Sequence, residues 1–157
     1  MEKNPEKFDI RDRLDYRVQI LANKMILWSA RTYSKNCGIG VQEWRILAIL
    51  MSNGEGSAKL ICNLSLMDKG KVSRTIKKLL KAGHLKETPD KKDKRSSVLV
   101  LTTTGRKLCN QIKKISDSRE KNFMSALSPS EQQLLPKILS SLEGVMEDLL
   151  EKQAVQK

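Results

Sequence analysis

Basic side chains are concentrated in one quarter of this sequence. Residues 68–106 hold 12 of the 30 lysines and arginines but only four of the 18 acids, so this stretch carries +8 of the chain's net charge of +12. Ammonium and guanidinium groups at this density bind phosphates, and an arginine can also donate two parallel hydrogen bonds to paired acceptors. The pattern indicates a polyanionic partner, either a nucleic acid or an anionic membrane surface.

The first group of these cations falls on a predicted helix of residues 68–83, which Asp68 caps and Gly83 ends. We expect its apolar face to pack on the core; this face contains Val72, Ile76, Leu79 and Leu80. The opposite face is basic. Its first two turns carry the candidates for contact with base edges, which are Lys69, Lys71, Ser73 and Arg74. Its later turns carry Lys77, Lys78 and Lys81, which suit phosphates because a phosphate requires charge more than geometry.

The second group of cations forms a loop between two predicted strands, residues 84–88 and 97–101. The loop contains Lys91, Lys92, Asp93, Lys94 and Arg95. Because this hairpin follows the basic helix directly, it brings a second basic group to the same side. A short helix capped by Ser57 precedes the basic helix across a three-residue turn, which predicts a helix-turn-helix. An ordinary amphipathic helix with a solvated basic face is the alternative.

The remaining elements must hold this unit in place. Residues 11–35 predict a helix with an apolar seam of Leu14, Val18, Leu21, Met25 and Trp28. A second helix covers residues 41–52, and residues 53–56 end it. Thr102 caps a fifth helix, and the capping box from Ser128 to Glu131 begins a sixth that runs to about Glu151. Pro136 should kink that last helix or displace its first turn. The predicted fold is mainly α with a small β-hairpin.

Three short motifs in the run from Leu64 to Gly105 occur together. Asp93-Lys94-Arg95-Ser96 is similar to a D-x-R loop motif, Leu101-Thr102-Thr103-Thr104-Gly105 is similar to an L-T-x-x-G helix start, and residues 79–85 fit the end of a recognition helix. In this order and at these spacings they resemble the winged helix-turn-helix core of the MarR family of bacterial transcription regulators. The flanking helices fit the same family in length and layout.

The resemblance implies a fold, a function and site residues. It implies a DNA-binding lobe of residues 36–105 and a helical dimerisation region of residues 11–35 and 106–152. In the family, the arginine at the tip of the wing enters the minor groove and an aspartate orients it, and these roles fall on Arg95 and Asp93. The expected partners are a second copy of the chain and a pseudo-palindromic double-stranded DNA operator. The family also commonly binds small aromatic anions, for which Trp28, Arg31 and Trp44 are the candidate residues.

The resemblance favours a ligand-responsive repressor, while an activator or a nucleoid-type anti-silencer without a dedicated ligand remains an alternative. A basic membrane-surface module is a remote one. We expect no enzyme, since GEGSAK at residues 54–59 lacks the phosphate-loop spacing and the chain has a single histidine.

No cofactor or metal is expected. The three scattered cysteines predict reduced thiols, with redox sensing left open, and Cys37 is expected to lie past the end of the first helix. The opening residues have no apolar signal region, so the sequence predicts a cytoplasmic, nucleoid-associated protein.

Overall fold

The computed structural model describes residues 8–89 and 97–155 of the chain. The chain divides into two compact units, Met1–Lys113 and Lys114–Lys157. The first contains a 3₁₀ turn η1 (Ile10–Asp12), α1 (Leu14–Cys37), α2 (Val41–Asn53), β1 (Glu55–Gly56), α3 (Ala58–Ser65), α4 (Lys69–Lys81), β2 (Leu85–Pro89), β3 (Ser97–Leu101) and the first half of α5 (Thr103–Met124). The second contains the rest of α5 and α6 (Pro129–Val155). The predicted mainly helical fold with a small hairpin is confirmed.

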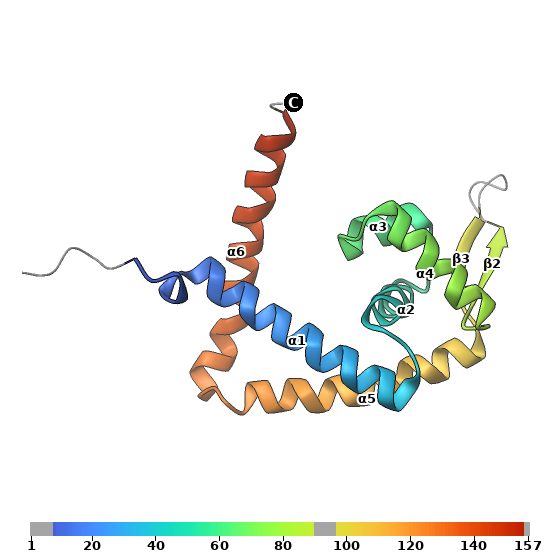
Figure 1. Ribbon diagram of the computed structural model, residues 1–157, viewed down its shortest axis with the longest axis horizontal. Helices are drawn as coiled ribbons and strands as arrows, with labels where there is room; N and C mark the ends of the chain where they lie inside the picture. The colour runs from blue at the N-terminus through green and yellow to red at the C-terminus, as the bar shows by residue number, and fades with distance from the viewer. Residues whose placement is uncertain (1–7, 90–96, 156–157) are drawn as a thin grey trace, which may run out of the picture. The chain divides into compact units, whose positions relative to one another are not determined.

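α2 is the centre of the first unit. It contacts α1, α3, α4, β1 and β3. Figure 1 shows it close to α3 and α4. Its residues Ile46, Leu47 and Leu50 have no exposed surface, and Ile61 of α3 and Ile112 of α5 are equally buried. These side chains form a continuous apolar core, which supplies the main stabilising term for such a small lobe.

The helix starts follow the capping signals in the sequence. The Ser57 hydroxyl accepts a hydrogen bond from the Leu60 N–H at 3.2 Å, and the Asp68 carboxylate accepts one from the Lys71 N–H at 2.7 Å. The capping box is also formed, because the Ser128 N–H donates to the Glu131 carboxylate at 2.7 Å. α6 therefore begins at Pro129 and continues across Pro136, so that proline does not displace the first turn.

α1 ends later than the sequence predicted. It continues through Cys37 and stops at Gly38, whose left-handed backbone (φ 66°) ends the helix while its N–H donates to the Ser34 carbonyl. The expectation that Cys37 lies past the helix end was therefore wrong. Glycine tolerates a positive φ at no steric cost, so the helix stops at Gly38 and not at Asn36.

The hairpin is paired as predicted, but the sheet has a third strand. β2 and β3 are antiparallel, with register from Leu85 opposite Leu101 to Pro89 opposite Ser97. β1 pairs with the other edge of β3, so the strand order is β1-β3-β2. The sequence predicted this segment only as the end of the second helix. Two residues are too few to show an alternating pattern in the sequence. They form a strand because they pair with the otherwise free edge of β3.

Candidate nucleic-acid interface

The orientation of α4 is set by its buried stripe. Val72, Ile76 and Leu79 are almost fully buried, and α4 packs on α2 and α3. Leu80, which was predicted to share this face, is half-buried, and Thr75 is buried while its hydroxyl donates to the Lys71 carbonyl at 2.8 Å. With this stripe facing the core, the opposite side of α4 must face solvent.

All the candidate contact residues of α4 are exposed. Together with Lys81 in the last turn they form the basic face, which consists of Lys69, Lys71, Ser73, Arg74, Lys77, Lys78 and Lys81. A Cβ added at Gly70 would lie 3.3 Å from Nη1 of Arg74, so the Arg74 guanidinium lies back over the first turn of the helix. It therefore adds its charge to the end of α4 that was predicted to reach base edges.

One lysine of the basic face has a partner in α2. The Lys78 ammonium donates to the carboxylate of Glu43, whose side chain is 8% exposed. The same carboxylate accepts a hydrogen bond from the Gly40 N–H at 3.1 Å, which caps the start of α2. Glu43 was not predicted as a site residue, since no local signal links two residues 35 positions apart.

The turn between α3 and α4 is held by hydrogen bonds. Leu66 adopts a left-handed backbone (φ 52°), which a non-glycine residue rarely takes. The Ser65 hydroxyl accepts from the Met67 N–H at 3.3 Å, and Arg45 of α2 donates to the Ser65 carbonyl at 3.4 Å. These hydrogen bonds fix how α4 leaves α3 and therefore where the basic face is placed.

The base of the hairpin is anchored next to α4, which contacts β2. Val98, Leu99 and Leu101 of β3 are buried, which explains why an apolar strand follows a basic loop. The five loop residues predicted to contact DNA, Lys91, Lys92, Asp93, Lys94 and Arg95, lie outside the described residues. Their roles remain predictions.

The L-T-x-x-G segment joins β3 to α5 by close packing. The Thr102 hydroxyl donates to the Gly83 carbonyl at 2.7 Å and accepts from the Gly105 N–H at 3.0 Å. A Cβ at Gly105 would lie only 2.1 Å from the His84 carbonyl oxygen. Glycine is therefore required here for contact between two backbones, and the motif holds the end of α4 against the start of α5.

The candidate ligand residues are linked by a third aromatic residue. Tyr33 is 1% exposed and lies edge-on to both tryptophans, with ring centroids 6.4 Å from Trp28 and 6.0 Å from Trp44. Arg31 is exposed on α1, and Trp28 is 40% exposed. The structure thus brings Trp28 and Trp44 together around Tyr33, which was not predicted because it lies off the apolar seam.

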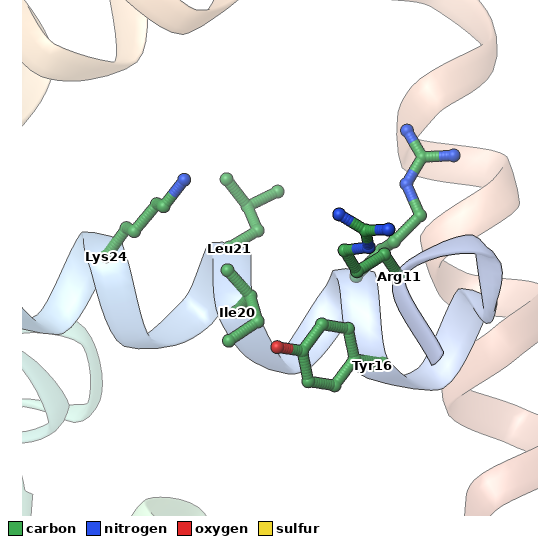
Figure 2. Close-up of a pocket in the computed structure, with 6 residues that line it drawn as sticks. Arg11, Tyr16, Ile20, Leu21 and Lys24 are labelled. Atoms are coloured by element: carbon green, nitrogen blue, oxygen red, sulfur yellow. The ribbon is translucent and has the colours of Figure 1, made fainter. Parts of the chain in front are cut away.

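Two cavities combine cations with apolar side chains. One, of about 470 Å³, lies between the helices of the helix-turn-helix and is lined by Ala58, Lys59, Cys62, Lys69, Val72 and Ser73. The other, of about 270 Å³, is an open groove along η1 and α1, lined by Arg11, Tyr16, Arg17, Ile20, Leu21 and Lys24. Figure 2 shows Arg11 and Lys24 toward opposite ends of this groove, with Ile20 and Leu21 between them. Neither cavity was predicted.

Metal-binding clusters and membrane spans are both missing from the described part of the chain. Within residues 8–89 and 97–155, no group of three or more His, Cys, Asp or Glu side chains could hold a metal ion. None of the helices in these ranges is both long enough and apolar enough to cross a lipid bilayer.

Comparisons with known proteins agree with this geometry. The model of the MarR family matches residues 38–96. The uncharacterized HTH-type transcriptional regulator YkoM of Bacillus subtilis (strain 168) is 33% identical over 120 residues, which cover 76% of this chain and 78% of that protein.

Solved structures give the same result for the fold. A MarR/EmrR family transcriptional regulator from Acinetobacter sp. ADP1 superposes with a TM-score of 0.82 at 30% identity, over 90% of this chain and 99% of that one. BpsR of Bordetella bronchiseptica has a TM-score of 0.75 at 16% identity, over 88% and 98% of the two chains. Members of this family are transcription regulators and not enzymes. The chain belongs to the MarR family of DNA-binding transcription regulators.

Proposed function

We propose that this protein is a ligand-responsive repressor that binds a pseudo-palindromic DNA operator as a homodimer. The observation that carries the proposal is the basic face of α4, which is exposed while the opposite stripe of the helix is buried. A helix held in this way can enter a major groove with its first turns against base edges. BpsR, which shares the fold, was solved in work on the regulation of its DNA binding by 6-hydroxynicotinic acid.

The proposed DNA contacts divide into three classes. Lys69, Lys71, Ser73 and Arg74 contact base edges in the major groove. Lys77, Lys78, Lys91, Lys92 and Lys94 supply charge for phosphates. Arg95 enters the minor groove, oriented by Asp93, because a planar cation suits a narrow groove of negative potential.

Two helices support the proposed dimer. Leu14, Val18 and Leu21 of α1 and Leu142, Val145 and Leu149 of α6 are 40–62% exposed in the single chain. Apolar rows of this length on separate helices are typical of interfaces. The two helices also have opposite charge: Leu14–Cys37 contains four basic residues and one acid, while Pro129–Val155 contains two basic residues and five acids. The proposed dimerisation region keeps the bounds that the family resemblance implies, residues 11–35 and 106–152, and the proposed DNA-binding lobe is residues 36–105.

The proposed effector is a small aromatic anion. It stacks against the edge of the Trp28, Tyr33 and Trp44 cluster, while the exposed Arg31 guanidinium pairs with its carboxylate. A tenfold loss of operator affinity requires only about 1.4 kcal/mol of preferential binding to the DNA-incompetent state. Arg31→Ala should abolish both binding of an effective acid, followed by tryptophan fluorescence, and its effect on DNA.

The test of DNA binding starts from a randomised duplex library, from which the wild-type protein should enrich one pseudo-palindromic sequence. Arg95→Ala should weaken binding to that sequence far more than binding to random DNA, since it removes minor-groove insertion from both subunits. Lys92→Ala should weaken both about equally, and its salt dependence should be shallower by roughly 0.9 for each phosphate that it no longer binds. The same behaviour of both variants on both DNAs would contradict the assigned roles.

The remaining alternatives have their own outcomes. Repression of a promoter that carries the enriched sequence, relieved by an aromatic acid, supports the proposal. Activation of transcription, or no response to any ligand, favours the activator or anti-silencer. Co-sedimentation with anionic liposomes, without sequence enrichment, favours a membrane-surface module.

A further inference from the structure

Glu43 holds an unusual position for an acidic residue. Among residues 8–89 and 97–155, it is the one acidic residue that is buried. One of its carboxylate oxygens accepts from the Gly40 N–H at 3.1 Å, and the other accepts from the Lys78 ammonium. A buried carboxylate needs such partners, because an unpaired charge away from water is strongly disfavoured.

The carboxylate stays ionised in this environment. Burial alone would raise the pKa of Glu43, but the hydrogen bond and charge of Lys78 outweigh it with help from backbone N–H groups, and the pKa lies below its ordinary value. The Lys78 side chain is 68% exposed, whereas that of Glu43 is 8% exposed. The pair is therefore formed at neutral pH and remains accessible from the exposed side of α4.

The position of the pair in the fold gives it a consequence for DNA binding. Glu43 lies in the first turn of α2, just after the Gly38–Gly40 connection from α1, and Lys78 lies in the third turn of α4. The pair ties the basic helix, through a side chain, to the start of the central helix. It also neutralises one of the cations of the basic face.

We infer that Glu43 is a positioning residue that holds Lys78 back from DNA phosphates and fixes the rotation of α4 on the lobe. Lys78 then adds little to general attraction to DNA, and selectivity for the operator over random sequence rises. This inference rests on the proposed function, in which α4 is the recognition helix. The inference departs from the proposed function at one residue: Lys78 is half of an internal pair with Glu43 and not one of the phosphate contacts.

Glu43→Gln tests the inference directly. Glutamine keeps an oxygen that can accept from the Gly40 N–H, so the cap of α2 is retained. The substitution removes the negative charge that pairs with Lys78. The freed ammonium should bind a phosphate. Binding to a random-sequence duplex should therefore tighten several-fold, and the slope of log affinity against log salt should steepen by about 0.9 for each phosphate newly bound. The ratio of affinities for the enriched duplex and the random duplex should fall.

A second substitution makes the test specific. Lys78→Met should leave the salt slope on random DNA unchanged in the wild-type background but should make it shallower by about 0.9 in the Glu43→Gln background. Lys77→Met, at the neighbouring exposed lysine, should make the slope shallower in both backgrounds. Lys78→Arg keeps a cation for Glu43 and should preserve the wild-type ratio of affinities. A purely structural role would change stability without producing this dependence on background.

The outcomes separate this inference from the proposed function. If the wild-type protein enriches no sequence from the library, the proposed function fails. If it does, but Lys78→Met in the wild-type background changes the slope as much as Lys77→Met, then Lys78 binds a phosphate and the inference is wrong. Circular dichroism checks that each variant is folded. If Glu43→Gln does not fold, the comparison of Lys78→Met with Lys77→Met in the wild-type background still shows whether Lys78 binds a phosphate.

Discussion

Gly105 shows how a single residue can explain a sequence motif. The glycine of the L-T-x-x-G segment has no need of a positive φ; it is required because the backbone of the α4–β2 turn passes directly against it. The Thr102 side chain beside it accepts from the Gly105 N–H and donates to the Gly83 carbonyl. The threonine and the glycine together hold the start of α5 against the turn between α4 and β2.

Gly105→Ala should destabilise the protein by about 1–3 kcal/mol, because a Cβ placed 2.1 Å from the His84 carbonyl forces two backbones apart. Urea unfolding measures the change in the free energy of unfolding. Gly144→Ala in α6 is the matched control: a Cβ there meets nothing within 4 Å, and alanine is favoured over glycine in a helix by about 1 kcal/mol. Equal stability of the two variants would refute the close-packing explanation.

The three cysteines should differ in reactivity. Cys109 has no exposed surface, and burial, only partly offset by the charge of Arg106, raises its pKa to about 11. At pH 8 about one Cys109 thiol in a thousand would be the reactive thiolate. Cys37 and Cys62 are half-buried, and burial raises the pKa of Cys37 as well. Cys62 lines the cavity between α3 and α4, where a small reagent can reach it. Iodoacetamide at pH 8 should therefore label Cys62 first and Cys109 only after unfolding.

Mass spectrometry of the labelled peptides gives the order of modification. Rapid labelling of Cys109 in the folded protein would mean that α5 opens away from α2, since its thiol donates toward the Leu47 carbonyl at 3.8 Å. The expected order makes Cys109 a structural thiol and leaves Cys62 as the thiol that an oxidant would reach.

At the scale of elements, α2 positions everything that surrounds it. It packs against the buried stripe of α4, and its Arg45 donates a hydrogen bond to the turn that follows α3. Its Trp44 ring lies edge-on to Tyr33 of α1. The Glu43–Lys78 pair adds a charged link between α2 and α4. Because this link depends on an ionised carboxylate, its contribution to stability should depend on pH.

The stability difference between wild type and Glu43→Gln should be largest at neutral pH. The pKa of Glu43 is lower in the folded state than its ordinary value of 4.5, so the carboxylate stabilises the fold above pH 4.5. That stability is lost as the pH falls through the folded-state pKa, where the native carboxylate is protonated. Urea unfolding of both proteins at pH 7 and below pH 4 should show the gap closing. A gap that is constant with pH would mean that the pair contributes no net stability.

At the scale of the whole molecule, the apolar rows on α1 and α6 require a second copy in the proposed function. A protein ending at Ser128 lacks α6 and should sediment as a monomer, with operator affinity reduced because two recognition helices no longer bind together. In the full chain, Leu142→Lys should weaken the dimer, since it places a charge in the apolar row. Ser140→Lys, two residues away on the same helix, adds the same charge as a control.

Analytical ultracentrifugation across protein concentrations measures both effects. A full-length chain that remains monomeric at micromolar concentration would eliminate the dimer. If Leu142→Lys and Ser140→Lys weakened dimerisation equally, the added charge and not the apolar row would account for the loss.

Local order was readable from the sequence because its signals act between near neighbours. The caps at Ser57, Asp68 and Ser128 join residues three positions apart, and the buried stripe of α4 follows the helical period, so both were predicted and are observed. Hairpin pairing also follows from two adjacent strands and a short loop. These features need no knowledge of how helices dock.

Other features arise only when distant segments meet. They are the β1–β3 pairing, the Glu43–Lys78 pair, the packing of Tyr33 against Trp44 and the approach of Gly105 to His84. Their formation depends on the distances and angles at which α1, α2, α4 and β3 pack, and those are set by the shapes of all the core side chains together. A two-residue strand or a buried glutamate has no periodic signal of its own, so the docking of the helices and strands decides what it does.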